Sequence, residues 1–167
     1  KFIINISTNM KTIEIPIQVP NGFKIDSLDK EKSLIKCSEI PKSIIERIKT
    51  FQDAINELGE DDEDVKAFRL IENIEIPKHI ISHLQSIIIV KALNEGWIPD
   101  WSNRNQAKYF PWFDMEASSA GGFVYGDYGF WITNTFVGSR LCLKSSELAK
   151  YVGKQFKEIY ELHYVIK

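Results

Sequence analysis

The segment from Pro77 to Glu95, PKHIISHLQSIIIVKALNE, constrains the fold of this chain more than any other part of the sequence. Pro77 suits the first turn of a helix, and Gly96 suits the position just after a helix ends. Apolar residues occupy almost every side of this predicted helix, namely Ile80, Ile81, Leu84, Ile87, Ile88, Ile89, Val90 and Leu93. A helix of this kind has to be covered on all sides. The sequence therefore predicts a central, buried helix over about residues 77–95.

Three more segments have the periodicity of helices that bury one face. Ser43 and Glu46 have the spacing of a capping box at the start of the first, and Gly59 suits its end. The second begins in an acidic turn, which the positive end of a helix dipole favours. Ser145 or Ser146 can cap the start of the last. These helices are predicted over about residues 41–58, 61–73 and 145–161.

The N-terminal part of the chain has the alternation and turn residues of short strands. Residues 12–19, TIEIPIQV, predict an edge strand, because a proline within it removes a hydrogen-bond donor. PNG at 20–22 predicts a turn, after which residues 23–25 can return as a partner strand. Residues 34–37 predict a further short strand.

The C-terminal half predicts an antiparallel sheet within residues 107–144. Its strands are expected at 109–113, at 123–125 and 128–135 as a hairpin across 126–127, and at 141–143, with a loop at 118–122. The whole chain is then α+β, with a small N-terminal strand unit, a helical middle, and a C-terminal antiparallel sheet packed with helices. The expected organisation is a strand segment over 1–38 and a single α+β domain over 39–167.

The charge of the chain favours neither nucleic acid nor an anionic membrane, since the net charge is −2 and the pI is about 6.0. The charge is also unevenly distributed. Residues 51–75 carry nine acidic side chains against two basic ones, whereas residues 137–167 carry six basic against three acidic. Two solvated faces explain this pattern, and so does an acidic docking surface or a pair of regions that attract each other.

Several classes of protein lack their sequence signature here. No window of 18 uncharged apolar residues predicts a membrane span. Cys37 and Cys142 are far apart and have no metal or redox spacing, which favours a reduced intracellular protein. The glycine-rich run GGFVYGDYG lacks the lysine of a phosphate-binding loop and predicts turns. We therefore expect no cofactor.

Two sets of residues have the composition of metal ligands. His79 and His83 are spaced i, i+4 on the predicted central helix, but the intervening glutamate of a metalloprotease is missing, so no metal site is predicted. Asp114, Glu116 and Asp127 are carboxylates of the kind that bind magnesium in nucleases. They leave a metal-dependent hydrolase open as an alternative.

The best candidates for a binding site lie in or next to the aromatic region, since residues 97–136 contain twelve aromatic side chains. Aromatic rings interleaved with cations bind single-stranded nucleic acid, but four acidic residues against two basic ones in this region disfavour phosphate. The rings can equally form a core or an exposed interaction surface. The candidate binding residues are Trp97, Trp101, Arg104, Lys108, Tyr109, Trp112 and Arg140, and the polar loop around Arg104 is the first place to look.

The segments ALNEGWIPDWSNRNQAKYFPWF and VGSRLCLKSSELAKYVGKQFKEIY resemble a family of uncharacterised proteins from phages and prophages of Bacteroides-type gut bacteria. The family pattern is W-x-P-D-W-x-N after a helix, then aromatic strands, then R-L-x-x-K-[ST]-x-E-L before a final helix. The matching residues are Trp97, Pro99, Asp100, Trp101, Asn103, Arg140, Leu141, Lys144, Ser145, Glu147 and Leu148. The resemblance covers about residues 10–37 and 77–160, and the acidic middle departs from it.

The resemblance implies an origin in mobile-element DNA and a location in the bacterial cytoplasm, but it carries no catalytic residue. The start MKTIEIPIQVPNGFKID is also similar, which implies Met10 as the initiator and residues 1–9 as upstream sequence. Together with the residues above, it predicts a non-enzymatic accessory protein that binds another protein or a second copy of itself. Two alternatives to this prediction stay open. One is an accessory protein that binds single-stranded nucleic acid, and the other is the metal-dependent hydrolase.

Overall fold

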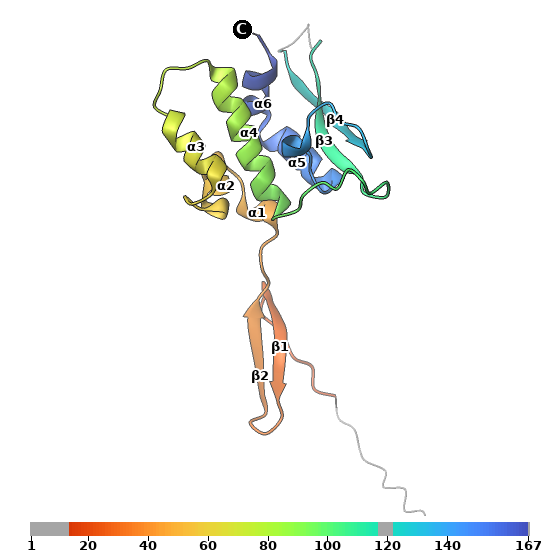
Figure 1. Cartoon of the computed structure of the whole chain (residues 1–167). Helices are drawn as coiled ribbons and strands as arrows, with labels where there is room; N and C mark the ends of the chain where they lie inside the picture. Colours follow the sequence, from red (N-terminus) through yellow and green to blue (C-terminus); the bar gives the residue numbers. More distant parts are fainter. Residues whose placement is uncertain (1–13, 117–121, 167) are drawn as a thin grey trace, which may run out of the picture. The chain divides into compact units, whose positions relative to one another are not determined.

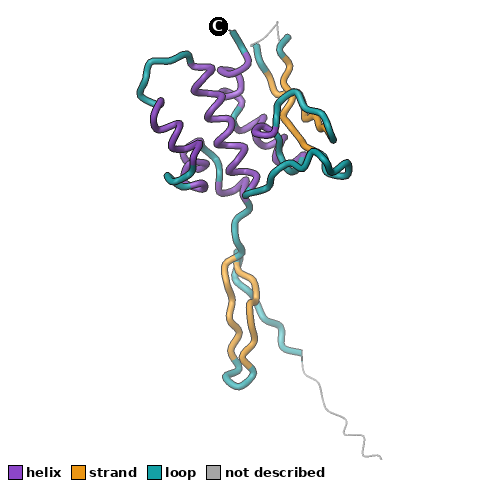
Figure 2. Tube along the Cα trace, in the orientation of Figure 1, coloured by secondary structure: helices purple, strands orange, loops and turns teal. Residues whose placement is uncertain are grey.

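The computed structural model describes residues 14–116 and 122–166, and the chain divides into two compact units, Lys1–Pro41 and Lys42–Lys167 (Figure 1). The described elements are six α-helices, one 3₁₀ helix and two antiparallel sheets of two strands each (Figure 2). Each unit contains one of the two sheets. The predicted α+β class is confirmed.

The first unit is a β-hairpin of β1 (Phe23–Asp29) and β2 (Leu34–Glu39). The strand predicted over 12–19 is wrong for its described part, because residues 14–19 form no strand, and residues 12–13 lie outside the described residues. The predicted pairing of 23–25 with that segment is wrong for the same reason. Prolines along 14–20 remove backbone donors, whereas β2 can pair with β1 over its full length.

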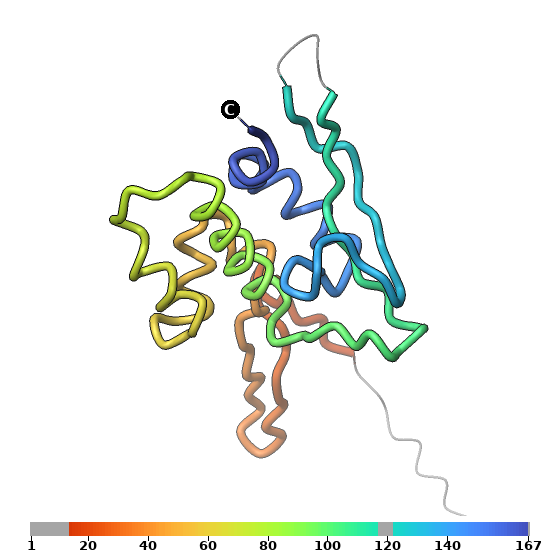
Figure 3. The backbone as a smooth tube through the Cα atoms, turned by 45° about the horizontal axis from the view of Figure 1, so that its top comes forward, coloured from red at the N-terminus to blue at the C-terminus, as the bar shows by residue number. Residues whose placement is uncertain are grey.

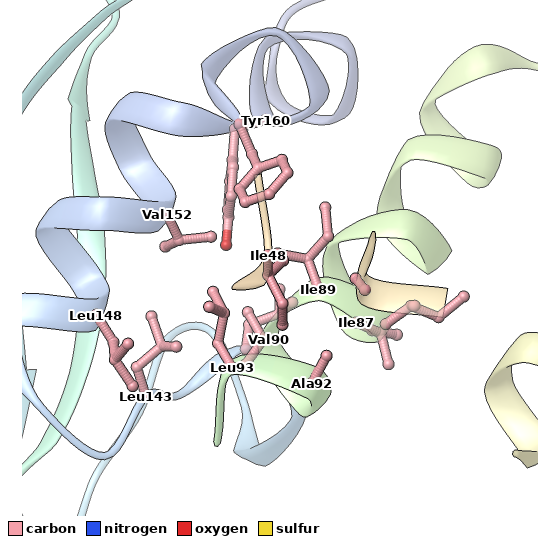
Figure 4. Packing of buried hydrophobic residues seen from close by; sticks show 14 of the residues in the cluster. Ile48, Ile87, Ile89, Val90, Ala92, Leu93, Leu143, Leu148, Val152 and Tyr160 are labelled. Atoms are coloured by element: carbon pink, nitrogen blue, oxygen red, sulfur yellow. The ribbon is translucent and has the colours of Figure 1, made fainter. Parts of the chain in front are cut away.

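The core of the second unit is built around α4 (Lys78–Asn94), as predicted. Most of the second half of this helix is buried, and its last turns pack against side chains from other helices and from the segment before α5 (Figure 4). Glu95 adopts a left-handed conformation with φ 49°, and Gly96 follows with φ 79°, so the chain leaves the helix where the sequence indicated. This helix contacts most of the other helices of the unit.

The helix predicted over 41–58 is in fact two helices, α1 (Ile44–Arg47) and α2 (Phe51–Leu58). Ile48 lies between them in an extended conformation, and its side chain is fully buried. Its carbonyl accepts a hydrogen bond from the hydroxyl of Tyr151 on a distant helix. The break exposes this carbonyl to its tertiary partner, which local periodicity cannot reveal.

Capping side chains set the ends of both helices. Ser43 and Glu46 form the predicted capping box, with the Ser43 N–H donating to the Glu46 carboxylate at 2.8 Å. Thr50 and Asp53 form a second box that starts α2, with a 3.2 Å bond from the Asp53 N–H to the Thr50 hydroxyl. Gly59 ends α2 with φ 84°, as expected of a residue that tolerates positive φ.

The helix predicted over 61–73 is present as α3 (Glu63–Ile71), two residues shorter at each end, and it begins in the acidic segment. Asp62 caps α3, and its carboxylate also lies 2.8 Å from the ammonium of Lys91 on α4. The same ammonium lies 2.7 Å from the carboxylate of Asp64. Part of the acidic charge is therefore paired within the unit.

The helix predicted over 145–161 is likewise two helices, α5 (Ser146–Gln155) and α6 (Lys157–Tyr164). The predicted cap at Ser145 is confirmed, since its hydroxyl accepts from the Leu148 N–H at 3.3 Å. Phe156 departs from helical geometry between the two helices and is buried. The change of direction lets α6 pack along α4.

The second sheet pairs β3 (Lys108–Asp114) with β4 (Val124–Trp131), and Figure 3 shows this pair running along one side of the helices of the unit. The predicted hairpin between 123–125 and 128–135 is wrong, because Val124 to Trp131 is one continuous strand. Gly126 is an extra residue in that strand, at a bulge where a turn was expected. The predicted loop at 118–122 lies, except for residue 122, outside the described residues.

Instead of the strand predicted over 141–143, a 3₁₀ helix, η1 (Ser139–Leu141), precedes a single bridge. Leu143 pairs with Tyr109 through two backbone hydrogen bonds of 2.8 and 3.0 Å. This bridge attaches the segment before α5 to the edge of β3.

Candidate functional site

The register of β3 and β4 assigns their side chains to two faces. Pro111 and Tyr125 point toward α5, because a Cβ added to Gly153 of that helix would lie 2.9 Å from Pro111 and 2.5 Å from the Tyr125 ring. Alternation along the strands therefore places Phe110 and Trp112 on the opposite face. That face points away from α5.

An apolar groove, which we call the aromatic groove, lies along this region and has a volume of about 490 Å³. Trp112 is 64% exposed and Phe136 is 87% exposed. The Phe110 ring lies flat on Gly129, where an added Cβ would lie 2.6 Å from the ring. Trp131 meets Phe136 edge-on with ring centroids 5.3 Å apart. The remaining lining residues are Pro111, Phe113, Met115, Tyr128, Val137 and Tyr164.

No residue that lines the aromatic groove is charged. Alternation places two carboxylates, Asp114 and Asp127, on the same face as Trp112. The ammonium of Lys150 on α5 lies 4.8 Å from the centre of the ring of Tyr128, a lining residue, and that of Lys154 lies 5.5 Å from the ring of Tyr125, outside the lining. The apolar lining can therefore bind apolar side chains, whereas the Lys150 ammonium beside Tyr128 does not form the row of cations that follows a phosphate backbone.

The structure gives Lys108 a role inside the fold. It is fully buried at the start of β3, and its ammonium donates to the backbone carbonyl of Asp100. It also lies 2.8 Å from the Gln106 carbonyl, 3.0 Å from that of Ile132 and 3.3 Å from that of Asn103. We call this arrangement the lysine cage. The ammonium is enclosed by main-chain acceptors and is not presented to a ligand.

Two more candidate residues belong to the surroundings of the lysine cage. The Trp101 ring lies 5.2 Å from the ammonium of Lys108, and its indole N–H donates to the Ser139 hydroxyl at 2.8 Å. Tyr109 is half-buried beside the rings of Tyr128 and Phe130, with centroids 5.9 and 5.8 Å away. Both residues stabilise the link between loop and sheet.

The predicted binding residues do not form a single site. Trp97 and Arg140 line a separate cleft of about 330 Å³ beside α4. Arg104 is exposed on the polar loop after Trp101. In that loop the Ser102 hydroxyl donates to the Asp100 carboxylate at 2.6 Å and lowers the pKa of Asp100 below its ordinary value. Of the seven candidates, the structure places Trp112 in the aromatic groove.

Sequence reasoning missed Phe110, Trp131 and Phe136 as groove residues. The alternation of Phe110 with Trp112 was a usable signal, because period-two aromatics share one face of a strand. The pairing of Phe110 with Gly129 depends on register and could not be read from either segment alone.

The carboxylates proposed for a hydrolase serve local structure where the structure shows their contacts. Asp114 accepts the backbone N–H of Glu116 at 2.9 Å, which closes a turn at the end of β3. Within residues 14–116 and 122–166, no group of three or more histidine, cysteine, aspartate or glutamate side chains is placed to hold a metal ion. The hydrolase alternative gains no support from this geometry.

The two histidines of α4 are joined by the third histidine of the chain. The Nδ1 of His83 lies 3.1 Å from the Nε2 of His163 on α6, and the ring centroids are 4.5 Å apart. Burial lowers the pKa of His163 and the neighbouring His83 lowers it further, while a hydrogen bond with the His79 backbone offsets part of the shift. The contact with α4 therefore favours the neutral imidazole of His163.

We expect the second unit to lose stability as the pH falls below about 6.5, the ordinary pKa of histidine. His163 has a lowered pKa in the folded state, so the unfolded chain binds more protons than the folded one below that pH. The contribution of His163 to the free energy of unfolding is fully present above about pH 6.5, and it is lost as the pH falls through its lowered folded-state pKa. Urea unfolding at a series of pH values measures the effect. His163→Phe should flatten that part of the profile, and an unchanged slope would contradict the assignment.

Comparison of the chain with protein-family models, with curated proteins and with solved structures finds no match. Among the described residues, no helix has both the length and the apolar character to cross a membrane.

Proposed function

We propose that this chain is a non-enzymatic accessory protein of a phage or prophage that binds a partner protein through the aromatic groove. The observation that carries the proposal is an uncharged groove whose aromatic side chains include Trp112 and Phe136, both mostly exposed. Exposed apolar patches of this kind mark interaction sites. The resemblance to phage proteins supports the bacterial cytoplasm as its place of action.

The composition of the groove favours protein over nucleic acid as the partner. Tryptophan, phenylalanine, tyrosine and methionine are enriched in protein interfaces, and all four line this groove. Stacking platforms for single strands combine rings with cations that follow the backbone. Here the exposed charges on the same face, Asp114 and Asp127, are negative.

The size of the groove suits a small number of apolar anchor side chains. Its volume of about 490 Å³ lies within the range of ordinary ligand pockets, roughly 300–1,000 Å³. Tryptophan is among the residues that dominate binding energy at protein interfaces. We therefore assign the main contribution to the exposed indole of Trp112, with Phe136 as a second exposed ring of the groove.

The test is a pull-down with the full chain from lysate of a Bacteroides-type bacterium, followed by titration of the captured protein after purification. Trp112→Ser and Phe136→Ser should each weaken binding by about 30-fold or more, as hot-spot residues do. Leu70→Ser is the matched control, because Leu70 is 77% exposed on α3, outside the groove. The proposal fails if the control weakens the complex as much as the groove variants do.

The nucleic-acid alternative is tested by titrating the full chain with single-stranded oligonucleotides at low salt while tryptophan fluorescence is recorded. We expect no quenching. Quenching that disappears in Trp112→Ser and weakens steeply with salt would replace the protein partner by a nucleic acid.

A further inference from the structure

The β1–β2 hairpin has no core of its own. None of the described residues from Glu14 to Pro41 is buried, and Ile25 and Leu28 on β1 are 52% and 58% exposed. A two-stranded hairpin is at best marginally stable in water unless an apolar face is covered. The hairpin therefore requires a covering surface.

A β-bulge gathers the apolar residues of the hairpin on one face. Ile25 pairs with Cys37 and Leu28 pairs with Ile35, while Asp26 is an extra residue without a partner. Without the bulge, Leu28 would lie on the face opposite Ile25, because the two residues are three positions apart. The extra residue shifts the alternation by one position, so Leu28 lies on the same face as Ile25. This surface, which we call the hairpin face, consists of Phe23, Ile25, Leu28, Ile35 and Cys37.

The two ends of the hairpin face differ in charge. Glu39 pairs with Phe23 and shares its face at the open end. The turn at the other end carries Lys30 and Lys32 with one acid, Glu31, between them. A two-fold axis that crosses the strands at right angles brings the open end of one copy over the turn of the other. Each Glu39 then faces a turn with net positive charge.

We propose that the hairpin face packs against the same face of a second copy of this chain, with the hairpins antiparallel. Dimers with two-fold symmetry, in which the same surface patch of both copies meets, are the commonest homo-oligomers. The hairpin face has far fewer residues than the roughly 20–30 that each partner contributes to a standard interface. The dimer is therefore reversible, and it forms through a unit separate from the one that carries the aromatic groove.

Sedimentation of the full chain over a range of concentrations tests the proposal. We expect a monomer–dimer equilibrium that Ile25→Lys and Leu28→Lys each weaken by at least tenfold. Leu34→Lys is the matched control, because Leu34 is 48% exposed in the same hairpin but pairs with Asp29 on the opposite face. A chain that stays monomeric at every concentration overturns the proposal, and so does a Leu34→Lys variant that dissociates as completely as Leu28→Lys.

Two further measurements remain decisive if an apolar variant fails to fold. Glu39→Lys should weaken dimerisation, and adding Lys30→Glu and Lys32→Glu should restore it, which no local unfolding would produce. A short bismaleimide should join two copies through Cys37, since the other cysteine, Cys142, is buried. Cross-linking that persists equally in Leu28→Lys would show that the hairpin face is not the interface.

Discussion

Replacing Lys108 by methionine should lower the free energy of unfolding of the second unit by about 1–3 kcal/mol or more, the cost of leaving buried acceptors unsatisfied. Methionine fills a similar volume but donates no hydrogen bond, so the carbonyls around the lysine cage would stay buried without their donor. Urea unfolding followed by tryptophan fluorescence measures the loss.

The matched control for this change is Lys66→Met, because the Lys66 side chain is 58% exposed and its ion pair with Asp61 lies in solvent. We expect that control to shift stability by less than about 0.5 kcal/mol. Equal losses in the two variants would show that Lys108 acts only as a charge, without a special role for the carbonyls.

Replacing Gly153 by valine should cost about 1–3 kcal/mol through overpacking, although glycine is a poor helix former. Gly153 lies inside α5, and an added Cβ would come within 2.5 Å of the Tyr125 ring. The absence of a side chain at this position lets α5 lie directly on the sheet. Valine would separate the two and disturb the face opposite the aromatic groove.

A second glycine of the same region provides the control. A Cβ on Gly126 would meet Trp112 at 3.6–3.7 Å, an ordinary contact, so Gly126→Ala should change stability little. Adding Tyr125→Ala to Gly153→Val should recover part of the loss attributed to the clash, which a double-mutant cycle isolates. Additive effects of the two changes would place the strain elsewhere.

Local patterns were sufficient for the elements whose ends are set by their own residues. The central helix, the Ser43–Glu46 capping box and the stop at Gly59 follow from periodicity and from side chains within a few residues. The break at Ile48 could not be foreseen, since its carbonyl finds its partner at Tyr151, more than a hundred positions along the chain. Long-range hydrogen bonds decided that boundary.

The candidate site was predictable by region and not by residue. Composition identified the aromatic stretch, and the candidate binding residues included Trp112. They also included Lys108, whose ammonium in fact donates to backbone carbonyls of the chain itself. The groove depends on the pairing of Phe110 with Gly129 and on a loop that brings Phe136 to Trp131. The pairing depends on the strand register, which shifts at the bulge at Gly126. The loop contact depends on tertiary structure.

The lysine cage has a consequence for how this protein can change over evolutionary time. Every acceptor around Lys108 belongs to the main chain, so the ammonium recognises the path of the loop and is indifferent to the identity of the side chains it displays. Substitutions at Arg104 can therefore alter the exposed surface while the loop keeps its shape. The exposed side chains of this loop can therefore diversify without loss of the fold.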